Sequence, residues 1–300
     1  MSGCSVRQVW RGDLDVAMED VRALTEKYPY VSLNVLWAGF VARPICCHEY
    51  AYASVKDAVD LCDPLQIGLS FADSHGRKPN YSVQFNLYFP RNCLVQETMD
   101  TLISQGYDAA KAALHGIEAN DFAEAMLTSE LVTNEDIRWI TYHGSYDLGF
   151  VYRALTTSQL PETRDEYIRN ITEYFPYLYD VKTMLCSKFG HRDLPGGLRS
   201  ACDFLGLGSL PIVVNPDASS RAGINSLLVS ACFFNALGQF FDNKIDDAKF
   251  KGQLYGVYDD DPLDDDLSPN GSIGVSAKLP PGMLRLKPGT YSPDAKKATG

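Results

Sequence analysis

The chain has 300 residues, of which 45% are apolar and 11% aromatic, and its formal net charge is −11. This length and apolar content are enough to bury the core of one large domain or two small ones. The negative charge argues against a general nucleic-acid binder that works by neutralising phosphates. No stretch reaches the roughly 18 uninterrupted apolar residues of a membrane span, and the opening MSGCSVRQVWRGDLD lacks the basic and apolar segments of a signal peptide. We therefore expect a soluble, intracellular protein with no membrane partner.

In chain order, the first predicted element is a helix in DLDVAMEDVRALTEKY (13–28), where apolar residues recur at helical spacing and Asp13 is a suitable N-cap. Three short apolar runs bounded by turn residues then predict strands in YVSLNVLW (30–37), LQIGLSFA (65–72) and SVQFNLYF (82–89). The last two runs are joined by DSHGRKPN, whose Gly76 and Pro79 suit a hairpin connection.

In the second half of the chain, helical patterns alternate with strands. A helical stretch over about 94–130 is interrupted by Gly106 and Gly116. Further patterns predict a strand in IRWITYH (137–143), a helix in GSYDLGFVYRAL (144–155), a strand and helix in YLYDVKTMLCSKF (177–189), and a long helix in AGINSLLVSACFFNALGQFF (222–241). Strands that are first adjacent and antiparallel, and later separated by helices, predict an α/β fold with a mixed β-sheet flanked by helices.

The charge distribution predicts where the folded domain ends. Residues 242–266 hold nine Asp and three Lys, a sum of −6, whereas residues 267–300 hold five Lys or Arg and one Asp, a sum of +4. Closely spaced like charges repel, and the Pro, Gly and Ser that follow cannot build a core. We expect one domain over residues 1–258 and an acidic, then basic, disordered tail over 259–300. Calcium binding by the Asp residues is the alternative.

The eight cysteines are scattered along the chain without a Cys-x-x-Cys pair. They are Cys4, Cys46, Cys47, Cys62, Cys93, Cys186, Cys202 and Cys232. This pattern predicts reduced, mostly buried thiols. The stretch Cys46-Cys47-His48 hints at zinc, but no second ligand pair lies at a zinc-finger spacing.

Four blocks of the sequence occur in the same order in a known family. They are YPYVSLNVLWAGFVARP (28–44), WITYHGSYDLGFVYRAL (139–155), YFPYLYDVKTM (174–184) and FFDNKIDDAKFKGQLYG (240–256). The chain resembles, over residues 8–258, the Caf1/Pop2 deadenylase subunits of CCR4-NOT complexes, a family of DEDD 3′-5′ exoribonucleases. The resemblance implies an RNase H-like mixed β-sheet flanked by helices, and the removal of adenylates from the 3′ ends of mRNA tails.

The resemblance also implies where the metal ligands of the family would lie. The family holds two divalent ions, magnesium or manganese, with four carboxylates, and the ions activate the attacking hydroxide and stabilise the leaving oxygen. These ligand positions match Asn34, Leu36, Asp147 and Asn225, and a neighbouring family histidine matches Ser220. Only Asp147 keeps a ligand-type side chain. Because each lost charge removes on the order of 4 kcal/mol of attraction at an effective dielectric near 20, we expect no bound metal and no other cofactor.

Each of these residues also has a structural interpretation. The Asn34 amide can hydrogen-bond neighbouring backbone or Asp147, and Asp147 suits the first turn of a helix. His143 is either a base or a hydrogen-bonded residue at a strand end. Arg43 and Pro44 match the VARP of the family and are expected to set the turn there.

Five basic residues are expected either to line a residual RNA groove or to form a solvated surface. They are Lys182, Lys188, Arg192, Arg199 and Arg221. RNA binding is expected to be weak or absent.

The resemblance implies three protein partners: a NOT1-like scaffold, a CCR4-like subunit and BTG/Tob-type proteins. Residues 116–132 correspond to the scaffold-docking surface of the family, and residues 240–256 belong to the surface met by BTG/Tob-type proteins. The residues expected there are Phe122, Ala125, Met126 and Leu131 in the first segment, and Asp242 and Tyr255 in the second. The apolar stripe of the first segment is either an interface anchor or a face turned to the core.

Together these observations predict a catalytically inactive Caf1/Pop2-like subunit of a CCR4-NOT-type mRNA deadenylation complex, acting as a scaffold or bridge in the cytoplasm and nucleus. The main alternative is an active poly(A)-specific 3′-5′ exoribonuclease that uses a degenerate magnesium or manganese site. A third possibility is an RNA-binding module that has kept the groove and lost the chemistry.

Overall fold

The computed structural model describes residues 4–40, 44, 49–89, 96–190, 196–208, 219 and 221–258. The expectations for the tail over 259–300 therefore lie outside the described residues. The same holds for single positions, namely Arg43, Cys46, Cys47, His48, Cys93, Arg192 and Ser220.

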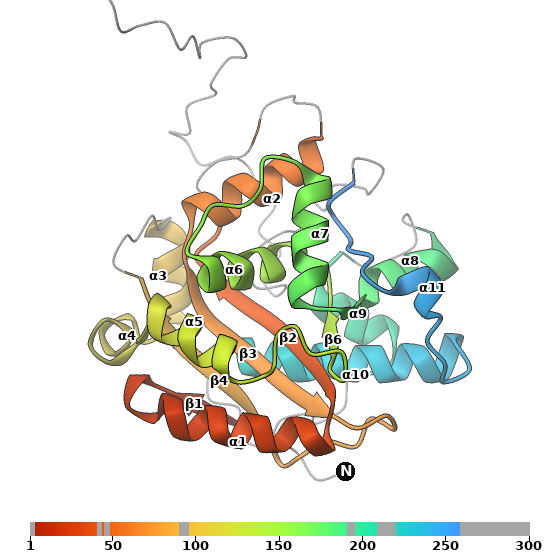
Figure 1. Cartoon of the computed structure of the whole chain (residues 1–300), viewed down its shortest axis with the longest axis horizontal. Coiled ribbons are helices and arrows are strands. Elements are labelled where there is room, and N and C mark those ends of the chain that lie inside the picture. Colours follow the sequence, from red (N-terminus) through yellow and green to blue (C-terminus); the bar gives the residue numbers. More distant parts are fainter. Residues whose placement is uncertain are drawn as a thin grey trace, which may run out of the picture.

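Within the described part of the chain, the strands form one seven-stranded mixed sheet (Figure 1). They are β1 (Ser5–Val9), β2 (Tyr30–Trp37), β3 (Pro64–Ala72), β4 (Tyr81–Tyr88), β5 (Ile117–Glu118), β6 (Arg138–Thr141) and β7 (Tyr177–Asp180). The strand order is β1-β4-β3-β2-β6-β7, with β5 beside β4. Strand β3 runs antiparallel to β2 and β4, and the other pairs are parallel. The predicted mixed sheet is confirmed.

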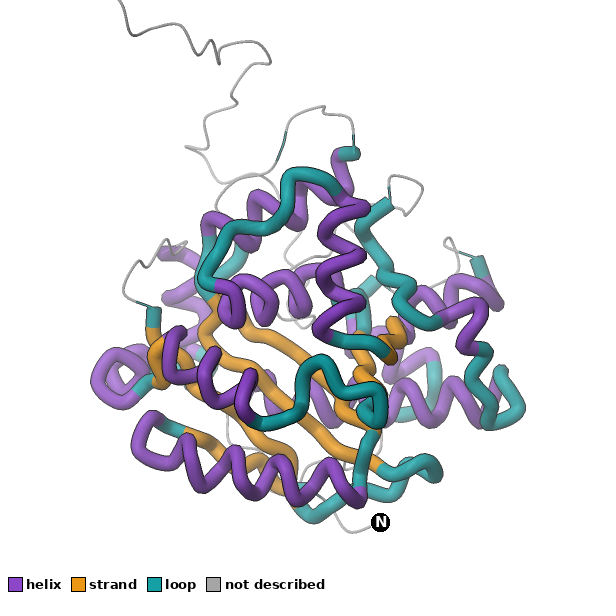
Figure 2. The backbone as a smooth tube through the Cα atoms, viewed as in Figure 1, coloured by secondary structure: helices purple, strands orange, loops and turns teal. Residues whose placement is uncertain are grey.

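Helices cover both faces of this sheet. They are the 3-10 helix η1 (Arg11–Asp13), α1 (Leu14–Lys27), α2 (Tyr50–Leu61), α3 (Gln96–Ser104), α4 (Ala109–His115), α5 (Ala119–Thr128), α6 (Ser145–Thr156), α7 (Arg164–Tyr174), α8 (Val181–Phe189), α9 (Leu198–Phe204), α10 (Arg221–Phe240) and α11 (Asp247–Phe250). Helix α10 crosses one face of the sheet, and α1, α5, α6 and α7 lie on the other (Figures 1 and 2).

The alternation of side chains along β2 explains the two layers. Leu33, Val35 and Trp37 are buried in the main apolar core, together with residues of α1, α5, α6 and α7. The intervening residues point to the opposite face, because successive side chains of a strand alternate. On that face Leu36 packs near Ala222 at the start of α10.

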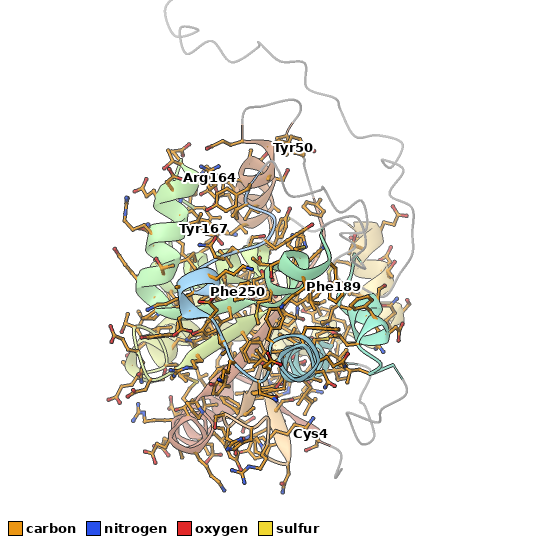
Figure 3. The ribbon with its side chains drawn as sticks, turned by 90° about the vertical axis from the view of Figure 1, so that its right-hand side faces the viewer. Cys4, Tyr50, Arg164, Tyr167, Phe189 and Phe250 are labelled. Carbon is orange, nitrogen blue, oxygen red and sulfur yellow. The ribbon has the colours of Figure 1, made fainter. Side chains whose placement is uncertain are left out.

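By length and composition, α10 is the one described helix that could cross a membrane, and 56% of its apolar window is buried inside the fold. It therefore has the surroundings of a core helix. A second apolar cluster joins α10 to α8, α9 and α11, on the side that Figure 3 presents with Phe189 and Phe250 labelled.

Most elements predicted from periodicity are present, but the short elements η1, β5, α9 and α11 were missed, and so were three longer ones. Strand β1 reads SVRQV and is mostly half-buried at the edge of the sheet, so it lacks a clear apolar alternation. Helices α2 and α7 were not predicted either. Helix α1 begins after Asp13 as expected, although the Asp13 side chain makes no capping hydrogen bond.

Candidate functional site

Asn34 and Asp147 meet at one edge of the sheet. Asn34 lies on β2, and its Nδ2 donates a hydrogen bond of 3.3 Å to Oδ2 of Asp147, in the first turn of α6. Strand β6 pairs with β2 only from Tyr30 to Ser32. Helix α6 therefore begins beside the unpaired end of β2, where the Val35 N–H also bonds the Asp147 carboxyl. The predicted contact between Asn34 and Asp147 is confirmed.

The Asp147 carboxyl is buried, with 6% of its surface exposed. Burial raises the pKa of Asp147 to about 8, with the negative charge of Asp180 adding to the rise and the bonds from Val35 and Asn34 opposing it. At neutral pH the carboxyl is therefore mostly protonated. Oδ1 of Asn34 is also buried and has no hydrogen-bond partner in the described residues.

The side chain of Leu36 lies on the same face of β2 as that of Asn34, because the two residues are two positions apart on the strand. Its side chain is 1% exposed and packs in an apolar cluster with Ala38, Leu65, Leu102 and Ala222. An apolar side chain enclosed by apolar neighbours offers no donor or acceptor at this position. The environment of Leu36 is thus that of a core residue.

The start of α10 is fixed to the sheet by two buried amides. Gln66 Nε2 and Gln84 Nε2 donate to the Ser219 carbonyl over 2.8 and 3.1 Å, and Gln84 Oε1 accepts from the Gly223 N–H over 3.0 Å. Gly68, which pairs with Asn34, allows this approach, because a Cβ there would stand 2.1 Å from the Ala222 carbonyl oxygen.

This anchoring places Asn225 in the first turns of α10, where it is half-buried. In the described part of the chain Asn225 has no hydrogen bond to Asn34 or Asp147. Of the four predicted positions, the structure therefore joins Asn34 and Asp147 by a hydrogen bond. Leu36 lies beside them on the same face of β2.

Asp180, which the sequence analysis missed, organises the turn that carries the site. Its buried carboxylate accepts backbone N–H bonds from His143 (2.9 Å), Gly144 (2.8 Å), Lys182 (3.0 Å) and Tyr255 (3.3 Å). Burial raises the pKa of Asp180, and these N–H donors and the charge of His143 oppose the rise. The available signal was an acidic residue at the end of β7 and at the N-cap of α8, but the partners of Asp180 come from three separate segments.

His143 has a structural setting. Its backbone takes a positive φ of 54°, and its ring stands edge-on to Tyr255 with centroids 4.9 Å apart. Tyr167 on α7, labelled in Figure 3, supports the same turn by donating its hydroxyl to the Ser145 carbonyl over 2.6 Å.

Comparison with known proteins decides the family. The family described as "CAF1 family ribonuclease" matches residues 123–205. The "Probable CCR4-associated factor 1 homolog 7" of Arabidopsis thaliana is 31% identical over 266 residues, which span 84% of this chain and 93% of the relative. The chain belongs to the CAF1/Pop2 family. "Poly(A) ribonuclease pop2" of Schizosaccharomyces pombe is 32% identical over 260 residues, which span 84% of this chain and 75% of the relative.

Solved structures of CAF1/Pop2 proteins share the fold. S. pombe Pop2p in its Mg²⁺- and Mn²⁺-bound form superimposes with a TM-score of 0.75 at 32% identity, over 84% of this chain and 99% of that one. Yeast CAF1 co-crystallised with the NOT1 MIF4G domain superimposes with a TM-score of 0.67 at 27% identity, over 83% of this chain and 96% of that one. The predicted RNase H-like exonuclease fold is confirmed.

The basic residues do not form the predicted groove or solvated face as a set. Lys182 is 2% exposed, donates to the Gly196 carbonyl over 3.0 Å, and lies 4.3 Å from the centre of the Tyr255 ring. Both interpretations of Lys182 are therefore wrong, because it is a buried structural cation. Arg221 is half-buried against Gln105. Lys188 is exposed, as the solvated-surface interpretation expects, with its ammonium over the Phe241 ring. Arg199 is exposed.

For the apolar stripe in and just after α5, the core interpretation is confirmed for three residues and the interface interpretation is wrong for them. Phe122, Met126 and Leu131 are at most 1% exposed and belong to the main core, so they have no surface to offer a partner. Tyr255 is likewise buried, whereas Asp242 is exposed. On α5 the exposed large apolar residue is Leu127.

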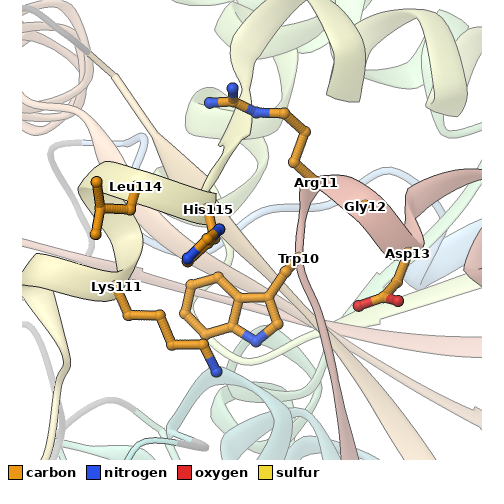
Figure 4. A pocket seen from close by; sticks show the side chains of 7 residues that line it. All are labelled: Trp10, Arg11, Gly12, Asp13, Lys111, Leu114 and His115. Atoms are coloured by element: carbon orange, nitrogen blue, oxygen red, sulfur yellow. The ribbon is translucent and has the colours of Figure 1, made fainter.

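A surface pocket of about 480 Å³ lies elsewhere, between the end of β1 and α4 (Figure 4). It is lined by Trp10, Arg11, Gly12, Asp13, Lys111, Leu114 and His115. Arg11 is held by the Gly116 carbonyl and Glu118, and Lys111 lies over the Trp10 ring. None of the predicted site residues lines this pocket.

Proposed function

We propose that this CAF1/Pop2-family chain is a catalytically silent subunit of a CCR4-NOT-type deadenylation complex, acting as a scaffold or bridge. The observation that carries the proposal is the packing of Leu36. At a position where the resemblance implies a carboxylate ligand, the chain places a leucine enclosed by apolar side chains.

The residues present do not fit a pair of divalent ions. Magnesium and manganese prefer several hard oxygen ligands, with carboxylates supplying most of the charge. Asp147 is the one carboxylate among the four matched positions. Within the described residues no group of three His, Cys, Asp or Glu side chains stands close enough to hold a metal ion. No catalytic step is therefore assigned to this site.

A ribonuclease assay tests the proposal. The purified chain and the S. pombe Pop2 relative would be incubated in parallel with an RNA ending in 3′-oligoadenylate and with Mg²⁺ or Mn²⁺. We expect shortening by the relative and none above background by this chain or by its Asp147→Asn variant. Shortening by the parent chain that disappears in Asp147→Asn would instead establish an active deadenylase with a degenerate site.

The proposed scaffolding role is supported by the structure of yeast CAF1 co-crystallised with the NOT1 MIF4G domain. We propose that this chain docks on a NOT1-like scaffold through the exposed side of α5 around Leu127, which is 48% exposed beside the buried Met126. Apolar side chains that remain exposed on a helix are suitable anchors for a partner. A CCR4-like subunit, BTG/Tob-type proteins meeting the surface around Asp242, and a location in the cytoplasm and nucleus complete the proposal.

A further inference from the structure

Two cysteines from different helices meet inside the second apolar cluster. Cys202 on α9 and Cys232 on α10 place their sulfur atoms 3.4 Å apart, and both side chains are buried. Their neighbours in this cluster are apolar or aromatic, among them Leu198 and Phe233. The pair is separate from Asn34 and Asp147, and the proposed function does not use it.

The two sulfur atoms share one hydrogen bond, in which either thiol can be the donor. This bond lowers the pKa of Cys202, with the charge of Arg199 assisting and burial opposing. Because the thiolate is the nucleophilic form of cysteine, the thiol that is under the influence of Arg199 is assigned the first attack. Its neighbour, with the sulfur 3.4 Å away, is placed to resolve the product.

The helix that carries Cys202 is short and reaches the surface. Helix α9 has seven residues, and the chain just after it is held to α10 by a bond of 3.1 Å from Gln239 Nε2 to the Leu205 carbonyl. Phe204, two residues after Cys202 in the last turn of α9, is 42% exposed. The buried sulfur of Cys202 therefore lies on a helix that is partly exposed to solvent.

We propose that Cys202 and Cys232 form an oxidative modification site, at which hydrogen peroxide converts the two thiols into a disulfide that joins α9 to α10. The Cys202 thiolate attacks the peroxide oxygen, the O–O bond breaks, and water leaves after protonation, giving a sulfenic acid at Cys202. The sulfur of Cys232 then attacks Sγ of Cys202, an S–S bond forms, the S–O bond breaks, and the Cys232 proton leaves with the hydroxyl as a second water. Two thiols are oxidised and one peroxide is reduced.

The cross-link would close a loop of 30 residues and restrict the unfolded chain. It would also tie α9 to the helix whose first turn packs beside Gly68 and Asn34. We therefore expect the oxidised protein to melt several degrees above the reduced protein and to return to the lower melting temperature with dithiothreitol.

Hydrogen peroxide added to the reduced full-length chain tests the proposal. After the remaining thiols are blocked, we expect intact mass to show the loss of two hydrogens, and peptide mapping without reductant to find the Cys202 peptide linked to the Cys232 peptide. Cys202→Ser and Cys232→Ser should each lose this linked peptide and the rise in melting temperature. Cys62→Ser, in the main apolar core, is the matched control and should keep both the linked peptide and the rise in melting temperature.

Three results would overturn the proposal. One is a folded parent protein in which Cys202 and Cys232 stay unlinked while other cysteines oxidise. Another is a Cys202–Cys232 disulfide that leaves the melting temperature unchanged and forms no faster in the folded protein than in protein unfolded by urea, where the two cysteines meet by chance. The third is a Cys232→Ala variant, included in case a serine variant fails to fold, that shows the same thermal response to peroxide as the parent.

Discussion

At the scale of single residues, the surroundings of the Asp147 carboxyl can be tested by its protonation. Asp147 is buried, and its Oδ2 accepts a hydrogen bond from the amide of Asn34. Burial and the negative charge of Asp180 favour the neutral carboxyl. Asn34 and Asp147 therefore form a hydrogen-bonded pair at two of the positions for which the resemblance implies ligands.

The raised pKa of Asp147 predicts a pH-dependent stability. The unfolded carboxyl releases its proton near its ordinary value of 3.8, whereas the folded one keeps it up to about 8. Between these values the folded state binds more protons, so the free energy of unfolding should fall as the pH rises, by up to about 1.4 kcal/mol per pH unit. Asp147→Asn is neutral throughout and should lack this contribution.

Urea unfolding of the parent and of Asp147→Asn at several pH values between 5 and 8 measures this contribution, since other titrating groups cancel in the difference. We expect the parent to lose stability relative to the variant with rising pH. A difference that stays constant with pH would mean that Asp147 is ionised in the folded protein.

Restoring the missing ligands is a second test at this scale. Asn34→Asp, Leu36→Glu and Asn225→Asp together return four carboxylates to the matched positions. Without metal, this variant should melt below the parent, because Leu36→Glu puts a charge among apolar side chains and carboxylates repel. Millimolar Mn²⁺ should recover several degrees.

Asn34→Asp alone is the control and should gain little from Mn²⁺, because ligands of one site act as a unit. A triple variant that folds but shows no manganese-dependent gain in melting temperature would contradict the assignment of these positions.

At the scale of elements, the sequence predicted which residues share a face better than it predicted what covers that face. The period of two in β2 correctly separated Leu33 and Val35 from Asn34, and the block after β6 correctly put Asp147 at the start of α6. The helical period of α5 grouped Phe122 with Met126, but periodicity does not distinguish a core from an interface. The hydrogen bonds that the Asp180 carboxylate accepts could not be predicted from the sequence, because their donors are backbone N–H groups that only the fold brings together.

Adjacent residues of α5 separate packing from docking. Met126→Ala should lower the free energy of unfolding by about 2–5 kcal/mol, because it leaves a cavity in the core. Leu127→Ala should change it by less than about 0.5 kcal/mol, because Leu127 is largely exposed. Leu127→Glu should abolish co-purification with a NOT1-like scaffold while leaving the melting temperature unchanged. Undiminished co-purification of Leu127→Glu would place the docking surface elsewhere.

The close approach of α10 to β3 is tested by a pair of glycine substitutions. In Gly68→Ala the added carbon meets the Ala222 carbonyl at 2.1 Å, so α10 must shift, and we expect a loss of about 1–3 kcal/mol in the free energy of unfolding by urea titration. Gly12→Ala, where an added carbon meets nothing within 4 Å, is the matched control. Equal stability of the two variants would refute the tight contact between α10 and β3.

At the scale of the whole molecule, the chain has the fold of the CAF1/Pop2 family, as the superposition on S. pombe Pop2p shows. In this chain the amides of Gln66 and Gln84 hold the start of α10 against the sheet. The buried Leu36 is compatible with this fold, because an apolar side chain needs no partner in the core. The proposed scaffolding role therefore requires no metal at this site.

Calorimetric titration of Mn²⁺ into the purified chain, with the S. pombe Pop2 relative titrated alongside, tests whether this chain holds a usable metal site. We expect saturable binding by the relative and no saturable binding by this chain at millimolar Mn²⁺, with coinciding traces for the parent and for Asp147→Asn. Saturable binding by the parent that Asp147→Asn removes would show that a usable metal site survives, and the proposed silent subunit would be wrong.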